Sequence, residues 1–192
     1  MQSSATEHLT DRSRADAPGT AGLRVLFTGD QIHARVRELG LEIARDYHDK
    51  QPLFVGVLKG ACMFQCDLAR ATPLEVELDF LSVSSYGRGT ASQGSVRLLS
   101  DLRGDVAGRH VVLCEGVVDT GLSATFILDL LRSRGPASLA VATLLDKRPC
   151  RKIEVPLRYV GWSIGADFVV GYGLDQTEQY RNLAFVAVLE GA

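Results

Sequence analysis

One stretch of the sequence, Val111 to Ala124, constrains the fold more than any other. It begins as an apolar run rich in β-branched residues, passes Glu115, turns at residues 119–121, and continues as an amphipathic helical pattern. Alternation of buried strands with helices is typical of α/β proteins. The stretch therefore predicts a buried strand whose carboxyl end leads directly into a helix.

The turn at residues 119–121 has the chemistry of an anion-binding site. A loop that enters a helix presents unpaired backbone N–H groups, and the helix dipole adds partial positive charge. Gly121 lets a ligand approach the backbone closely, and Thr120 and Ser123 add hydroxyl donors. A simpler interpretation is that Asp119 and Thr120 cap the helix, since both residue types are common caps. Taken alone, the turn favours the cap.

A second unit of strand, loop and helix lies earlier in the chain. Residues 52–58 form a continuous apolar run bounded by turn-forming residues, which predicts a strand buried on both faces. Lys59 and Gly60 follow, and residues 61–70 continue as a helix. Ligands of open α/β sheets bind at the carboxyl ends of the strands, so Lys59 is a candidate anion ligand. The alternative is a solvated lysine at a turn.

The remaining segments extend the same pattern. A half-exposed strand is expected at 74–83, and the glycine-rich segment 84–95 after it is long for a connector, which predicts a flexible hairpin. Helices are expected from about residue 30 to 47 and from 124 to 135. Further short strands are expected at 23–27, 96–99, 110–115, 138–145, 159–163, 168–172 and 184–189. The sum is a parallel α/β sheet with an antiparallel hairpin and a β-rich C-terminal part.

Composition limits the partners and the compartment. The chain has 192 residues, 46% of them hydrophobic, and a formal net charge of −2, so no basic surface invites nucleic acid. Residues 1–20 are polar and lack the apolar centre of a signal peptide, which predicts a disordered tail before one domain at 21–192. No apolar run is long enough for a membrane span. The cysteines lack paired spacing, which favours reduced thiols in the cytoplasm; they are Cys62, Cys66, Cys114 and Cys150.

Two familiar motifs nearly match and fail. Residues 116–123 have the glycine spacing of a nucleotide-binding P-loop, but Leu122 stands where that loop needs lysine. Residues 161–165 fit the G-x-S-x-G motif of serine hydrolases, yet all four histidines precede that serine. An ATPase or a serine hydrolase is therefore not expected.

Taken together, these motifs resemble the type I phosphoribosyltransferases, and most closely those that salvage hypoxanthine and guanine. The likeness covers residues 24–190. It implies an α/β fold with a central, mostly parallel sheet flanked by helices, a flexible hairpin lid and a small β-rich hood. It also implies transfer of 5-phosphoribosyl from phosphoribosyl pyrophosphate (PRPP) to a 6-oxopurine, giving IMP or GMP and pyrophosphate, with Mg²⁺, in a homodimer or homotetramer. A xanthine-preferring enzyme and a non-catalytic PRPP-binding regulator are the alternatives.

The resemblance also assigns roles to residues on the PRPP side. Asp119 matches the catalytic carboxylate, which takes or holds the N7 proton of the base. Asp175 and Glu115 match the acids expected at Mg²⁺. The residues expected to bind PRPP and its phosphates are Glu115, Thr120, Gly121, Leu122, Ser123, Ala124, Lys59, Gly60 and Arg181. The loop at Lys59 carries an unusual cis peptide bond in the family.

On the purine side, Lys147 matches the lysine that contacts the 6-oxo group. Phe168 matches the aromatic residue that stacks on the base, and the backbone of Val169 matches the group that reads the exocyclic position. Asp175 lies beside them in the sequence motif and is grouped with the purine site as well as the metal. Ser85, Tyr86 and Gly87 match the opening of the lid.

One residue departs from the family pattern. Gly116 stands where the family normally has a second acid that holds a ribose hydroxyl. Loss of a charged hydrogen bond of this kind weakens binding by about 1–3 kcal/mol. The sequence therefore predicts a weaker grip on the ribose, and tighter PRPP binding if Gly116 is replaced by Asp.

Overall fold

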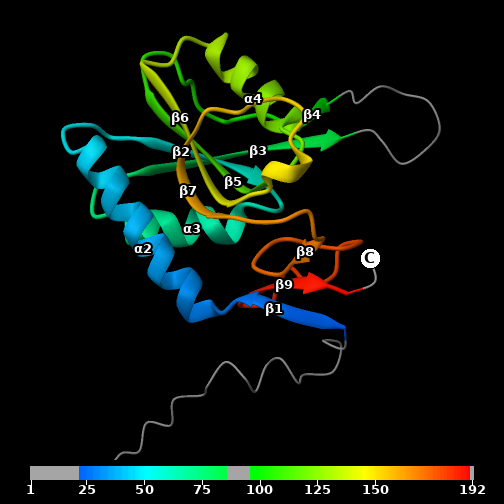
Figure 1. Cartoon of the computed structure of the whole chain (residues 1–192). Helices are drawn as coiled ribbons and strands as arrows, with labels where there is room; N and C mark the ends of the chain where they lie inside the picture. The colour runs from blue at the N-terminus through cyan, green and yellow to red at the C-terminus, as the bar shows by residue number, and fades with distance from the viewer. Residues whose placement is uncertain (1–21, 86–95, 191–192) are drawn as a thin grey trace, which may run out of the picture.

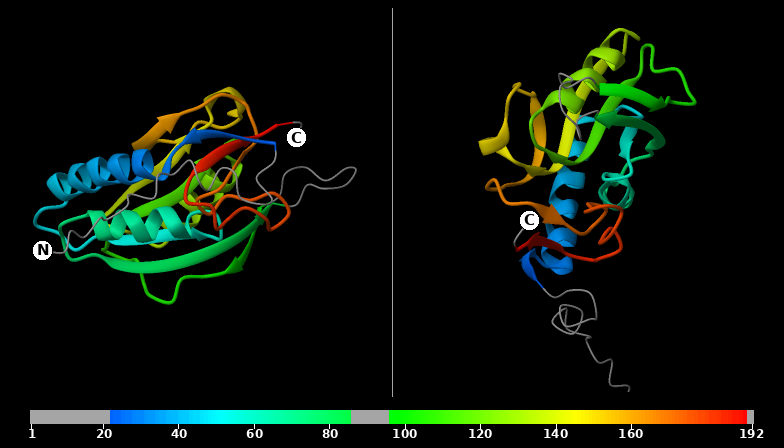
Figure 2. Two further views of the ribbon diagram at one scale, coloured as in Figure 1. Left: turned by 90° about the horizontal axis from the view of Figure 1, so that it is seen from below. Right: turned by 90° about the vertical axis from the view of Figure 1, so that its right-hand side faces the viewer.

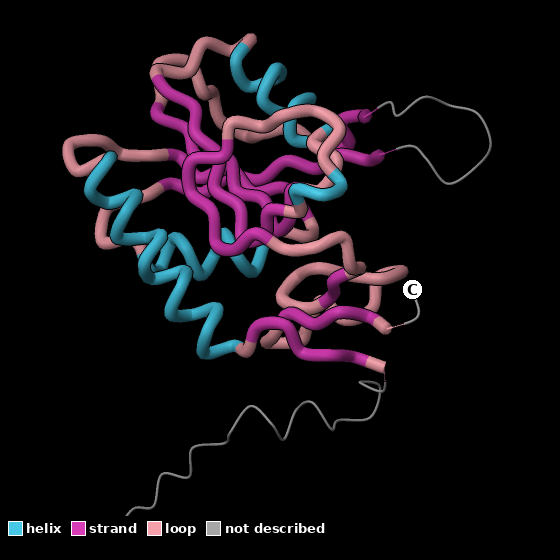
Figure 3. Tube along the Cα trace, in the orientation of Figure 1, coloured by secondary structure: helices cyan, strands magenta, loops and turns pink. Residues whose placement is uncertain are grey.

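The structure is a computed structural model in which residues 22–85 and 96–190 are described (Figures 1 and 3). These residues form a central sheet with helices on both faces and a smaller separate sheet. The elements are β1 (Leu23–Phe27), α2 (Gly29–Asp46), β2 (Leu53–Leu58), α3 (Cys62–Ala71), β3 (Glu77–Ser85), β4 (Val96–Ser100), β5 (His110–Val118), α4 (Leu122–Arg132), β6 (Ser138–Asp146), the 3-10 turn η1 (Arg148–Cys150), β7 (Leu157–Ser163), β8 (Val169–Val170) and β9 (Val186–Leu189).

The central sheet has the strand order β4-β3-β2-β5-β6-β7. All neighbouring strands are parallel except β3 and β4, which form the expected antiparallel hairpin. Helices α2 and α3 lie side by side on one face, and α4 covers the other (Figures 1 and 2). The α/β fold with a mostly parallel sheet is therefore confirmed.

The core has two layers because the middle strands are apolar on both faces. Val112 and Cys114 of β5 pack with α2 and α3, whereas Val111 and Leu113 pack with α4. Five of the six residues of β2 are buried, as its continuous apolar run predicted. The carboxyl ends of β2, β5 and β6 consequently emerge together at one edge of the sheet.

Helix α2 begins where its sequence predicts. Thr28 Oγ1 accepts a hydrogen bond from the backbone N–H of Gln31, and the Gln31 side chain accepts one from the Thr28 N–H, at 3.3 and 2.9 Å. This reciprocal capping box satisfies two N–H groups at the start of the helix. Thr28 is thus the N-cap residue of α2.

The second sheet is the β-rich hood, with the order β1-β9-β8 and antiparallel pairing throughout. It joins the first strand of the described chain to the last one, and it lies below the central sheet in Figure 1. The hood thus draws on both ends of the domain.

Some predicted boundaries were wrong. The strand expected at 74–83 begins only at Glu77, because Pro73 and a hydrogen bond from the Leu74 N–H to the Thr72 oxygen turn the chain before it. The strand expected at 168–172 is reduced to β8, because Gly171 and Tyr172 have positive φ angles and turn away.

The predicted tail at 1–20 lies outside the described residues. None of the helices in the described ranges is both long and apolar enough to cross a membrane.

Candidate active site

The candidate site lies where β2, β5 and β6 end. Lys59 follows β2, Asp119 follows β5, and Lys147 follows β6. Parallel strands bring these three residues to the same edge of the sheet, as the sequence predicts. The segment between β8 and β9 closes the site from the hood side, where Leu174 lies against Gly60.

The loop from residue 119 to 124 forms the wall of a pocket of about 190 Å³. Gly121 has φ +86°, and a Cβ atom at this position would lie 2.2 Å from the backbone oxygen of Ile153, so only glycine fits. The N-cap residue of α4 is Gly121, which has no side chain to cap the helix, and Asp119 makes no capping bond. The Thr120 hydroxyl accepts one long hydrogen bond, of 3.4 Å, from the Leu122 N–H, so the simpler interpretation as a helix cap holds in part for Thr120 alone. The N-terminus of α4 therefore faces the pocket as an anion-binding end. The lining includes Glu115, Asp119, Thr120, Gly121, Ser123 and Ala124.

Asp119 carries the one carboxylate of this loop. Its Oδ2 lies 3.6 Å from Nζ of Lys147, whose side chain is largely buried. Its Oδ1 is buried and has no hydrogen-bond partner among the described residues. A buried acceptor without a partner is costly, so this oxygen is arranged to accept a donor from outside the chain.

Glu115 lies deeper in the same pocket. Its residue is 9% exposed, and burial raises the pKa of its carboxyl group to about 8. A carboxyl group in this state is held protonated at neutral pH unless a cation or a hydrogen-bond donor arrives beside it.

A buried guanidinium that the sequence interpretation missed supports the loop that carries Asp119. Arg151 donates to the backbone oxygens of Asp119 and Val118, at 2.9 and 3.1 Å, and forms an ion pair with Asp146. Both side chains of the pair are buried. The backbone N–H groups of residues 152 and 153 add hydrogen bonds to the Thr120 oxygen. The segment that follows Lys147 therefore fixes the backbone of the loop that carries Asp119.

The predicted pyrophosphate ligands Lys59 and Arg181 meet at a third residue. Glu178 Oε2 lies 2.9 Å from Lys59 Nζ and 3.3 Å from Arg181 Nε. Arg181 Nη2 lies 2.9 Å from Asp175 Oδ1. The structure therefore brings Lys59, Arg181 and Asp175 together, and the Leu58–Lys59 peptide bond is cis, as the family resemblance implied.

Gly116 lies at the back of this region, against the Lys59–Gly60 loop. A Cβ atom at position 116 would lie 2.8 Å from the Gly60 oxygen and 3.0 Å from Leu174 Cδ2. Any side chain here must displace backbone. The expected gain in PRPP binding from Gly116→Asp stays a prediction, and it has a steric cost beside it. The close packing accounts for the glycine on steric grounds.

The purine-side residues are placed on two elements. Lys147 follows β6, and its backbone N–H donates to the Val118 oxygen at 3.0 Å. Phe168 and Val169 lie in the hood, where Phe168 is exposed and Val169 is buried. Tyr86 and Gly87 of the predicted lid lie outside the described residues, and Ser85 is the last residue of β3.

The acidic side chains at the site could hold a metal ion only if substrate phosphates supplied the remaining ligands. Across the described ranges, no cluster of three His, Cys, Asp or Glu side chains is arranged to hold an ion. Asp175 already pairs with Arg181, and Glu115 lies in the phosphate pocket. Mg²⁺ is commonly bound by one or two carboxylates plus substrate phosphates, which is the donor set that these two acids offer.

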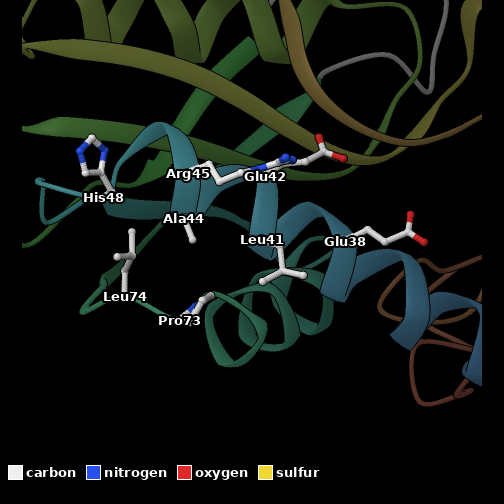
Figure 4. Close-up of a pocket in the computed structure, with 8 residues that line it drawn as sticks. All are labelled: Glu38, Leu41, Glu42, Ala44, Arg45, His48, Pro73 and Leu74. Atoms are coloured by element: carbon white, nitrogen blue, oxygen red, sulfur yellow. The ribbon is translucent and has the colours of Figure 1, made fainter.

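A larger cavity lies elsewhere and lacks this chemistry. It has a volume of about 720 Å³ and lies between α2 and the segment after α3, as Figure 4 shows. Mostly apolar atoms and surface charges line it, and no predicted site residue does. The lining residues are Glu38, Leu41, Glu42, Ala44, Arg45, His48, Pro73 and Leu74. Size alone therefore does not identify the functional pocket.

Comparison with known proteins agrees with this geometry. Residues 27–177 match the family described as "Phosphoribosyl transferase domain". The chain is 45% identical to the hypoxanthine-guanine phosphoribosyltransferase of Mycobacterium tuberculosis over 196 residues, covering 95% of this chain and 97% of that one. It is 42% identical over 167 residues to the bifunctional protein TilS/HprT of Listeria monocytogenes, covering 87% of this chain but only 26% of that longer protein.

The fold is similar to solved structures as well. A crystal structure of a hypoxanthine phosphoribosyltransferase from Staphylococcus aureus superposes with a TM-score of 0.84 at 38% identity, covering 95% of this chain and 96% of that chain. Sequence, fold and the geometry of the phosphate loop agree with one another. The chain belongs to the phosphoribosyltransferase family.

Proposed function

We propose that the protein transfers the 5-phosphoribosyl group of PRPP to hypoxanthine or guanine, forming IMP or GMP and releasing pyrophosphate. The observation that supports this most directly is the position of the Asp119 carboxylate. It lies between the N-terminus of α4, which is suited to a phosphate, and a buried lysine suited to a 6-oxo group. The names of the similar proteins supply the choice of base.

The phosphate loop positions the sugar. The backbone N–H groups at the start of α4, with the hydroxyls of Thr120 and Ser123, hold the 5′-phosphate in the pocket that they line. Lys59 and Arg181 neutralise the departing pyrophosphate. Asp175 and Glu115 would hold Mg²⁺, which supplies further charge neutralisation at the pyrophosphate when bound.

The base side then completes the reaction. A purine nitrogen forms a bond to C1′ of the ribose as the bond from C1′ to the pyrophosphate oxygen breaks. Asp119 accepts or holds the N7 proton through its free Oδ1. Lys147 donates to a 6-oxo group but faces another donor on a 6-amino purine, which disfavours adenine. Phe168 stacks on the base, and the Val169 backbone reads its exocyclic position.

Incubation with PRPP, Mg²⁺ and each of four bases tests the proposal. Nucleotide formation is expected with hypoxanthine or guanine and should be absent or at least about tenfold slower with adenine. Product from xanthine alone would replace the base assignment while keeping the reaction. Measurable PRPP binding without product from any base would instead identify a regulator.

We also propose that the protein is cytoplasmic and forms a homo-oligomer. All four cysteines are free in the structure, which agrees with a reducing cytoplasm. Assembly as a homodimer or homotetramer is proposed from the family, and light scattering of the purified protein tests it.

A further inference from the structure

One acidic residue, Glu178, is paired with both cations that the proposed reaction needs to bind pyrophosphate. Glu178 Oε2 accepts a hydrogen bond from Lys59 Nζ at 2.9 Å and one from Arg181 Nε at 3.3 Å. Lys59 follows β2 in the central sheet, whereas Glu178 and Arg181 lie in the hood segment between β8 and β9. A single carboxylate oxygen therefore joins two cations from two parts of the fold.

The backbone is shaped to bring Glu178 there. Its N–H donates to Asp175 Oδ2 at 2.9 Å, and Gln176 and Gln179 form a backbone bridge around it. Glu178 and Thr177 have φ angles of +68° and +48°, a conformation that residues other than glycine seldom adopt. The turn thus fixes the direction of the Glu178 side chain more firmly than its exposed position suggests.

All three guanidinium nitrogens of Arg181 have partners in this arrangement. Its Nη1 donates to the Gly173 oxygen at 2.8 Å, its Nη2 pairs with Asp175, and its Nε pairs with Glu178. Nη1 and Nη2 each keep a second N–H, but Nε has a single N–H, and Glu178 occupies it. A pyrophosphate oxygen that binds at Nε therefore displaces Glu178.

We infer that Glu178 is a displaceable counter-ion that stands in for pyrophosphate, weakens the binding of PRPP and pyrophosphate, and eases release of the product. This inference rests on the proposed function, because it takes Lys59 and Arg181 as the pyrophosphate ligands. Two negative groups in one place repel each other, and one must leave.

Glu178→Gln tests the inference because it removes the charge and keeps the shape. Calorimetry with the full chain and Mg²⁺ should show PRPP and inorganic pyrophosphate binding about two- to thirtyfold more tightly, the range of two exposed ion pairs. Ribose 5-phosphate, which lacks the pyrophosphate group, should bind with unchanged affinity. Glu190→Gln, at another exposed hood acid that pairs with Arg24, should change none of these affinities.

The outcomes separate the inference from the proposed function. If wild type binds neither PRPP nor pyrophosphate, the proposed function fails and the inference fails with it. If wild type binds both while Glu178→Gln and Glu178→Ala bind them equally or more weakly, only the inference is overturned. The inference would also be overturned if ribose 5-phosphate bound more tightly by the same factor. The lost charge would then act on any anionic ligand and not specifically on the pyrophosphate group.

Discussion

The guanidinium of Arg151 holds the backbone oxygen of Asp119 at 2.9 Å, from a side chain that is only 5% exposed. It bonds the Val118 oxygen and pairs with Asp146 as well. Asp146 is the last residue of β6 and precedes Lys147. One buried ion pair thus couples the loop of Asp119, the proposed catalytic carboxylate, to the end of β6, which is followed by Lys147, the proposed purine ligand.

Replacement of Arg151 should therefore cost both stability and PRPP affinity. Arg151→Gln leaves the Asp146 charge buried without its main partner, and we expect a loss of about 3 kcal/mol in the free energy of unfolding. The KM for PRPP should rise more than the KM for the base, since the phosphate loop loses its support. Urea unfolding and steady-state kinetics measure these changes. Arg132→Gln, at an exposed ion pair on α4, is the control and should change the free energy of unfolding by less than about 1 kcal/mol. Equal losses of stability in both variants would contradict the proposed support of the Asp119 loop by Arg151.

Asp119→Asn should separate chemistry from binding. The amide keeps the size of the side chain but cannot accept a proton, so kcat should fall by about 10²–10⁴-fold. The Kd for PRPP should change only a few-fold, because the phosphate is held mainly by backbone and hydroxyl groups. Asp129→Asn, at an exposed acid of α4, serves as the matched control. Wild-type turnover in Asp119→Asn would remove the residue from the reaction.

The pH dependence of stability should report on Glu115. Its pKa is raised from 4.5 to about 8 by burial, so the folded protein binds this proton more tightly than the unfolded chain does. The stabilising contribution is full at low pH and is lost as the pH rises between those two values, by up to about 1.4 kcal/mol per pH unit. Glu115→Gln cannot titrate, so its stability should fall less over this window. Thermal unfolding without ligand compares the two proteins, and parallel curves would contradict the shift.

Substitutions of Gly116 should separate a steric effect from a charge effect. Gly116→Ala adds only a Cβ, which must displace the Gly60 oxygen, and we expect a loss of about 1–3 kcal/mol in stability together with weaker PRPP binding. Gly116→Asp suffers the same displacement but adds an acceptor for a ribose hydroxyl. It should therefore bind PRPP about tenfold more tightly than Gly116→Ala does.

Gly104→Ala is the control for this pair, because an added Cβ there meets nothing within 4 Å. If Gly116→Asp and Gly116→Ala bind PRPP alike, the carboxylate does not reach the ribose. If neither variant loses stability relative to Gly104→Ala, the loop is not closely packed against position 116.

The sequence predicted those parts of the fold that depend on local pattern. The apolar run of β2 and the mixed apolar and turn residues around Asp119 determine their own structure, because burial and backbone preference act over a few residues. The pairing of β1 with β9 could not be read in the same way, since it joins segments at opposite ends of the chain. Local patterns carry no information on such a partner.

The residues missed at the site show the same limit. Arg151 follows a short turn in a charged segment, and its sequence context predicts an exposed side chain. Tertiary packing instead buries this side chain against the backbone of Asp119. Glu178 lies in a polar segment with no periodicity, and only its left-handed backbone and the meeting of two distant cations reveal its position. In both cases the signal arises from contacts made after the elements pack.

The hood has a consequence for the order in which the protein is made. Because synthesis runs from the N-terminus, β1 leaves the ribosome first, and its partner β9 is among the last segments to follow. A nascent chain that ends after β7 already contains every strand of the central sheet, including the phosphate loop, but leaves β1 without its neighbour. The central sheet, with the loops that carry Asp119 and Lys147, can thus assemble during translation, whereas the hood must wait for its completion.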